Sequence, residues 1–195
     1  MKKIIVLLLY VLVSNLLTFG QNSDQDVVGL RIESGYQIGV GDYGMDRWKL
    51  NVIGAHQLNP FLSLGLGAGF RYYSDIETAL IPVFADVWVR GSEGKISPCF
   101  SMGVGYSFDA TNGFEGVGFF LNPSVGVSFK MAGNSTMNLG LGYEMQKMNI
   151  GFFNIYEGYY YGYSYYGYTG YYDYSYSIPR RVNSDAICLS LGISF

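Results

Sequence analysis

The chain has 195 residues and a net charge of −3, and only 14% of its residues are charged, whereas it contains 27 glycines, 19 tyrosines and 13 phenylalanines. So few charges argue against a soluble globular protein, and the small negative net charge argues against a nucleic-acid partner. The composition suits a protein whose outer surface faces lipid.

Residues 1–20 have the organisation of a secretory signal peptide. Lys2 and Lys3 form a basic start, an apolar run follows from Ile4 to Val13, and Gly20 lies where small residues are expected before a cleavage site. The apolar run is shorter than the roughly 20 residues that a membrane-spanning helix needs. We therefore expect export, cleavage after Gly20 and one β-barrel domain over residues 21–195, with an uncleaved N-terminal anchor as the alternative.

The rest of the chain repeatedly alternates large apolar residues with small or polar ones. The clearest run is 61–72, where the apolar residues Leu62, Leu64, Leu66, Ala68, Phe70 and Tyr72 alternate with Ser63, Gly65, Gly67, Gly69 and Arg71. A period of two is typical of β-strands with two different faces. Because too many strands carry a large apolar face for a small barrel to enclose them all, we expect this face to contact lipid and the other face to point inward.

The alternation predicts eight strands, which in chain order are residues 27–40, 45–57, 61–72, 79–90, 96–108, 117–131, 135–148 and 186–195. Their lengths suit tilted strands that cross a membrane. An even number closes the sheet and removes its edges. The predicted fold is therefore an all-β, eight-stranded antiparallel up-and-down transmembrane β-barrel, in which Phe84 and Trp88 of the fourth strand point inward.

The predicted connections differ in length on the two sides of the barrel. Those at 58–60, 91–95 and 132–134 are short and rich in Gly, Pro and Asn, whereas those at 41–44, 73–78, 109–116 and 149–185 are mostly longer. Short periplasmic turns and long extracellular loops are typical of outer-membrane barrels. We therefore expect both termini on the periplasmic side.

The turn Leu58-Asn59-Pro60-Phe61 and the terminal run from Leu189 to Phe195, with the exported N-terminus, carry a family resemblance. The chain resembles the small outer-membrane β-barrel domain family of Gram-negative bacteria, whose members include OmpA- and OmpX-type proteins. The resemblance implies an outer-membrane location and a last strand that the barrel-assembly machinery recognises through Leu189, Leu191, Ile193 and Phe195. It implies no particular function, because such folds host many roles. A soluble, lipocalin-like periplasmic barrel is the alternative.

Eight charged residues on the predicted inward face are candidates for the barrel interior: Arg31, Glu33, Lys49, Arg71, Asp86, Arg90, Lys130 and Glu144. Buried charges must be paired or hydrogen-bonded, and eight strands leave an interior that side chains can fill. We therefore expect an internal ion-pair network. A narrow passive pore lined by charge is the alternative.

The sequence offers no catalytic, cofactor-binding or metal-binding residues. His56 is the only histidine, and its neighbours Ala55 and Gln57 supply no serine or carboxylate for a catalytic relay. Cys99 and Cys188 have no His or Cys at metal-ligand spacing. They fall on strands that are not neighbours in an eight-stranded barrel, so we expect two separate, buried thiols, with a disulfide between them as the alternative. A lipid-modifying enzyme is the least favoured interpretation.

Residues 156–176 are dominated by tyrosine interleaved with glycine. Tyrosine gives a large amphipathic contact area and glycine gives adaptability, so this tract is a candidate surface for an extracellular glycan or protein. A β-hairpin extension of the flanking strands and a self-associating tract without order are the alternatives. The candidate binding residues are Tyr159, Tyr160, Tyr161, Tyr163, Tyr165, Tyr166, Tyr168, Tyr171 and Tyr172.

These features together predict a monomeric, non-enzymatic outer-membrane barrel. Its strands would contact membrane lipid, and Arg180 and Arg181 near the outer rim would lie close to lipopolysaccharide. Its exposed loops would bind a ligand or strengthen the cell envelope.

Overall fold

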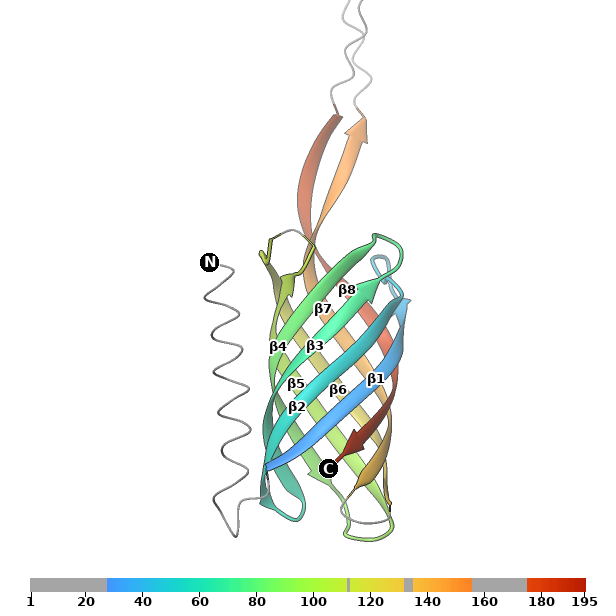
Figure 1. Cartoon of the computed structure of the whole chain (residues 1–195). Coiled ribbons are helices and arrows are strands. Elements are labelled where there is room, and N and C mark those ends of the chain that lie inside the picture. Colours follow the sequence, from blue (N-terminus) through green and yellow to red (C-terminus); the bar gives the residue numbers. More distant parts are fainter. Residues whose placement is uncertain (1–27, 112, 132–134, 156–174) are drawn as a thin grey trace, which may run out of the picture.

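The structure, a computed structural model, describes residues 28–111, 113–131, 135–155 and 175–195, so the predicted signal peptide lies outside the described residues. The strands are β1 (Val28–Val40), β2 (Arg47–Asn59), β3 (Leu62–Tyr73), β4 (Thr78–Arg90), β5 (Ile96–Asp109), β6 (Gly116–Lys130), β7 (Thr136–Ile155) and β8 (Ser175–Ser194). Each strand pairs antiparallel with the next, and β8 pairs with β1 to close the barrel (Figure 1). The predicted eight-stranded fold is confirmed. Within the described residues, no helix is long and apolar enough to cross a membrane.

The two faces of the strands are those that the alternation predicts. On β2, Trp48 is 58% exposed, whereas its neighbours Arg47 and Lys49 are 0% and 3% exposed. On β4, Phe84 and Trp88 point inward and are buried, as predicted. The barrel thus has an apolar outside and a filled, largely polar inside, the reverse of a soluble globular protein.

The last strand closes the barrel against the first. The β1–β8 register runs from Arg31 opposite Ser194 to Val40 opposite Asp185, and the Phe195 backbone N–H donates to the Leu30 carbonyl oxygen at 2.9 Å. The outward residues of this strand form one exposed apolar row: Ile187, Leu189, Leu191, Ile193 and Phe195. This pairing and this outward row are both as predicted.

Inward glycines make room for aromatic side chains in the middle of the barrel. A Cβ atom on Gly67 would lie 2.6 Å from the Phe84 ring, closer than packed atoms normally approach. Phe84 packs there with Phe120 and Ile53 in a buried apolar cluster, with the two rings 5.4 Å apart. The small face of β3 therefore accommodates the large inward residue Phe84 of β4.

The last two strands extend well beyond the other six. β7 and β8 have 20 residues each, and past Met148 and Val182 they stay paired over seven further residue pairs, from Asn149–Arg181 to Ile155–Ser175. Figure 1 shows this pair, which we call the arm (residues 149–155 and 175–181), rising beyond the barrel rim. We call that end of the barrel the arm end and the opposite one, near Phe195, the C-terminal end.

The prediction of a loop over 149–185 is therefore wrong at both of its ends, where the structure has strand. The large–small alternation stops near Met148, which is why the predicted strand ended there. Beyond it the sequence is rich in aromatic and β-branched residues, which favour strands without needing a small face.

Candidate functional site

At the arm end, the interior is closed by apolar side chains, which we call the apolar cap: Met45, Tyr73, Leu80, Met148 and Val182. Met45 lies two residues before β2, and the other four lie near the points where their strands meet that end of the barrel. Tyr43 and Val117 pack against them from outside the cluster. The cap separates the interior from that side of the barrel.

Directly below the cap, Glu144 is shared by two arginines. The Arg71 guanidinium donates from Nη2 to Oε2 at 2.9 Å and from Nε to Oε1 at 3.0 Å, and Arg47 Nε donates to Oε1 at 3.2 Å. All three side chains are fully buried. Arg47 also donates to the Ser184 hydroxyl at 3.0 Å. Paired and hydrogen-bonded in this way, the charges are compensated.

A second group of charges lies nearer the C-terminal end. Arg31 pairs with Glu33, at 2.9 Å from Nε to Oε1, and with Asp86, while its guanidinium lies 4.2 Å from the centre of the Trp88 ring. The Lys49 ammonium lies 3.8 Å from Glu33 Oε2 and donates to Asn122 Oδ1 at 2.9 Å. The two groups of charges form the ion layers of the interior.

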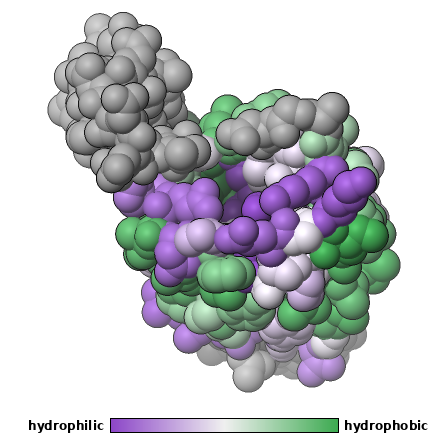
Figure 2. All heavy atoms as spheres, turned by 90° about the horizontal axis from the view of Figure 1, so that it is seen from below, coloured by the Kyte–Doolittle hydropathy of each residue, from purple (hydrophilic) through white to green (hydrophobic). Residues whose placement is uncertain are grey.

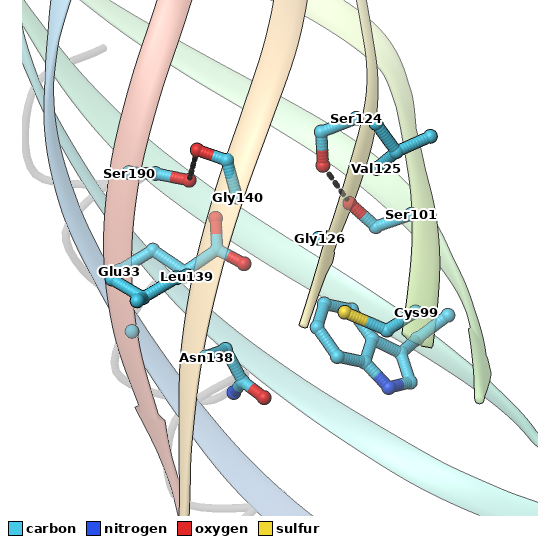
Figure 3. A pocket seen from close by; sticks show the side chains of 12 residues that line it. Glu33, Cys99, Ser101, Ser124, Val125, Gly126, Asn138, Leu139, Gly140 and Ser190 are labelled. Carbon is cyan, nitrogen blue, oxygen red and sulfur yellow. Dashed lines mark hydrogen bonds between the residues drawn. The ribbon is translucent and has the colours of Figure 1, made fainter. Parts of the chain in front are cut away.

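A small cavity borders the second ion layer (Figure 3). Glu33 and Asn138 face Cys99 and the hydrogen-bonded hydroxyls of Ser101 and Ser124, which are 2.6 Å apart. Its volume is about 10 Å³, which is about enough for one water molecule. A space of this size passes no solute.

A much larger cavity, of about 300 Å³, lies at the C-terminal end. Arg31, Trp88, Arg90, Lys130 and Ser194 are among its lining residues, and the exposed side chain of Lys130 shows that it reaches solvent. Figure 2, viewed from this end, shows hydrophilic residues across the barrel end and hydrophobic residues on its flanks. Among the described residues, the interior is thus open and polar at the C-terminal end, whereas the apolar cap closes it at the arm end.

The structure brings six of the eight predicted inward charges into the ion layers and leaves two outside them. Arg90 is only half-buried, and Lys130 is exposed, with its ammonium donating to the Glu93 carbonyl oxygen at 2.7 Å. Both lie at strand ends, where the barrel opens. The alternation also places Arg47 inward, but no sequence pattern shows that it shares Glu144 with Arg71.

The remaining candidate residues are scattered. Cys99 and Cys188 are buried and unbridged, as predicted, and His56 lies on β2 opposite Val28 and Leu64. Within the described residues, no group of three or more His, Cys, Asp or Glu could hold a metal ion. The nine candidate tyrosines lie outside the described residues, in the segment that joins the two strands of the arm.

Solved structures similar to this chain include small outer-membrane β-barrels. Neisserial surface protein A is 11% identical with a TM-score of 0.57, and the match covers 88% of this chain and 98% of that one. The N-terminal β-barrel domain of Pseudomonas aeruginosa OprF (15% identity, TM-score 0.45, 88% and 100% covered) and the outer membrane enzyme PagL (10% identity, TM-score 0.44, 85% and 98% covered) also match. No family model and no curated protein matches the chain.

At such low identities the likeness shows the fold alone. The chain has the fold of the small eight-stranded outer-membrane β-barrels, which is the fold that the sequence resemblance implies. Its function has to be argued from its own residues.

Proposed function

We propose that this protein spans the outer membrane as a non-enzymatic, non-conducting barrel and displays its tyrosine-rich tract at the cell surface, where the tract binds a glycan or a protein. The arm is the observation that carries this proposal. Its seven residue pairs correspond to roughly 20 Å of strand at about 3.3 Å per residue. An arm of this length would hold the tract clear of the barrel and of the membrane surface.

The outer surface of the barrel supports the membrane location. Aromatic side chains that are 38–58% exposed lie toward the arm end: Tyr36, Trp48, Tyr72, Tyr106 and Tyr143. Tyr36, Trp48 and Tyr72 are cross-strand neighbours, and the first two rings meet edge to face at 5.6 Å. Aromatic girdles of this kind lie at the membrane–water interface of outer-membrane barrels, which would place the arm outside the membrane and close to lipopolysaccharide.

The closed interior supports a barrel that does not conduct. Arg47, Arg71 and Glu144 are fully buried beneath the apolar cap. An ion could therefore cross the barrel only by disrupting both the cap and this layer of paired charges. A narrow passive pore is therefore the weaker candidate. In planar bilayers we expect no stable conductance steps from the purified protein, and large, stable steps would contradict this part of the proposal.

The exposed apolar row of β8 supports recognition by the barrel-assembly machinery during insertion. The last residue of this row, Phe195, is 57% exposed. We expect deletion of Phe195 to reduce the amount of heat-modifiable barrel in the outer membrane, whereas Phe61→Leu, at an exposed position of the turn between β2 and β3, leaves it unchanged.

The surface-binding proposal is tested by removing the tract and keeping the arm. Residues 156–174 are replaced by Asn-Gly, which favours a two-residue hairpin turn, and a second variant changes the nine candidate tyrosines to serine at constant length. Both variants should insert and keep heat-modifiable mobility, and both should lose binding of intact cells to glycan and host-protein arrays. Unchanged binding in either variant would refute the proposal, as would an epitope tag in the tract that stays inaccessible on intact cells.

A further inference from the structure

The cavity at the C-terminal end has a cationic lining. Arg31, Arg90 and Lys130 border it, and among the described residues that line it the one acidic group is the main-chain carboxylate of Phe195, because none of them is an aspartate or a glutamate. Serine and threonine hydroxyls, from Ser194 and Thr136, add neutral donors. A concave space with convergent cations and hydroxyls is suited to an anion rather than to a cation or an apolar ligand.

Two of the three cations have no acidic partner within the described parts of the chain. Arg31 is paired with Glu33 and Asp86, but the Arg90 Nε is buried without a hydrogen-bond partner among the described residues. Lys130 donates to the uncharged Glu93 carbonyl oxygen. The half-buried Arg90 side chain lines the cavity, so an anion there would meet a guanidinium that no carboxylate of the described residues neutralises.

The rest of the interior does not supply the missing negative charge. The buried charged side chains of the described barrel are four cations, Arg31, Arg47, Lys49 and Arg71, and three carboxylates, Glu33, Asp86 and Glu144. The ion layers therefore carry one excess positive charge before Arg90 and Lys130 are counted. The field of this excess favours an anion at the open end of the barrel.

We propose that this cavity binds the phosphate group of a small phosphate ester, with Arg90 and Lys130 as its charge partners. The planar fork of an arginine fits phosphate oxygens, and a lysine adds a point charge. A phosphate monoester carries about −1.5 to −2 charges near neutral pH, which matches two uncommitted cations better than a single carboxylate does. The cavity volume of about 300 Å³ leaves room for an attached organic group.

The phosphate group has two sources with the same chemistry. One is a soluble phosphate ester in the compartment that this end of the barrel faces, and the other is a phospholipid headgroup at the nearby membrane edge. The inference does not rest on the proposed role of the arm, which lies at the opposite end of the barrel.

The two tryptophans of the chain allow a direct binding measurement. Trp88 lines the cavity, whereas Trp48 lies on the exposed outer face, so a Trp48→Phe background leaves Trp88 as the only tryptophan. In maltoside micelles, which contain no phosphate, Trp88 fluorescence is recorded during titration with inorganic phosphate. A titration with chloride at the same ionic strength corrects for salt effects.

We expect a saturable change in Trp88 fluorescence with phosphate and none with chloride. Arg90→Gln and Lys130→Gln should each weaken phosphate binding at least tenfold. Lys147→Gln, a matched change at an exposed lysine toward the arm end, should leave it unchanged. Heat-modifiable mobility of every variant verifies that the barrel is folded.

A second series separates the two sources. The same proteins are placed in phosphatidylcholine bilayers with and without phosphatidic acid, whose headgroup is a phosphate monoester. A response to inorganic phosphate in micelles supports a soluble ligand, and a response to phosphatidic acid alone supports a headgroup. The proposal is overturned if neither probe gives a saturable change, or if folded Arg90→Gln and Lys130→Gln proteins bind as tightly as the parent.

Discussion

The two ends of the barrel interior differ in kind although the same strands build both. At the arm end, Tyr73 and Leu80 are fully buried in the apolar cap. At the C-terminal end, the corresponding inward positions of these strands carry Ser63 and Arg90, and they border an open cavity. The alternation keeps the same face inward from one end to the other, so the difference comes from which residue types occupy that face. One end is built for closure, whereas the other leaves charged groups available.

The comparison predicts that buried charge at the arm end is far more important for stability than charge at the open end. Glu144→Gln should be the most damaging single substitution in the barrel interior, because it leaves Arg47 and Arg71 buried without their shared carboxylate. Removing one partner of a buried ion pair costs roughly 3–5 kcal/mol. The free energy of unfolding, measured by denaturant titration of barrels in lipid vesicles, checks this loss.

The matched control is Glu93→Gln in the exposed turn between β4 and β5, because its side chain is at the surface. Surface changes of this kind typically alter stability by no more than about 0.5 kcal/mol. A loss at Glu144 no larger than the loss at Glu93 would show that the shared carboxylate does not stabilise the barrel.

The apolar cap should be the next most sensitive region. Leu80 is 1% exposed within the cap, so Leu80→Ala leaves a void that the neighbouring strands cannot fill, and we expect a loss of roughly 2–4 kcal/mol in unfolding free energy. Leu58→Ala, at a residue that is 53% exposed near the opposite end, is the matched change and should be close to neutral. Equal losses at the two leucines would mean that the cap is not a packed layer.

A smaller effect is expected where an inward glycine admits an aromatic ring. Gly67→Ala places a Cβ atom 2.6 Å from the Phe84 ring, and overpacking of this kind costs roughly 1–3 kcal/mol. In Gly94→Ala, the nearest atom would be 3.4 Å away, so that variant should be neutral in the same unfolding experiment. A neutral Gly67→Ala would indicate that Phe84 moves aside freely and that the middle of the barrel is loosely packed.

The sequence predicts faces well because a period of two fixes, residue by residue, which side chains point inward. The inward orientation of Phe84 and Trp88 followed from that period alone. The period-two pattern does not predict which inward residues meet across the barrel. Glu144 of β7 reaches Arg47 of β2 and Arg71 of β3 because the barrel closes, and this closure brings together side chains that are far apart in the sequence.

The arm and the C-terminal cavity escape sequence-based prediction for different reasons. The arm continues past Met148 without the small inward face by which the barrel strands are recognised. The cavity depends on how far each inward residue lies from the end of the barrel. The alternation does not encode this distance, because it distinguishes only inward from outward positions. Arg90 and Lys130 fall on the inward parity in the sequence, but only their position at strand ends makes them border an open cavity rather than join an ion layer.

The smallest effect on stability should come from Arg90→Gln at the open end. Arg90 makes no ion pair or hydrogen bond with its side chain among the described residues, and its Nε is buried without a partner, so its removal breaks no stabilising contact. We expect a change of no more than about 0.5 kcal/mol without phosphate, in contrast to Arg71→Gln, which removes the bidentate partner of Glu144.

The Arg71→Gln and Arg90→Gln barrels should also differ in how much stability they gain from added phosphate. A ligand that binds only the folded barrel stabilises it by an amount that grows with its concentration, about 2.7 kcal/mol at 100 times the dissociation constant. The parent and the Arg71→Gln barrel, if it folds, should both gain stability when phosphate is added, because Arg71 lies away from the cavity. Arg90→Gln should gain at least about 1.3 kcal/mol less at that phosphate concentration, because it lacks one of the two charge partners and binds at least tenfold more weakly. A large loss of unfolding free energy in Arg90→Gln without phosphate would instead show that Arg90 stabilises the barrel. Charge at the open end would then contribute to stability as charge at the arm end does.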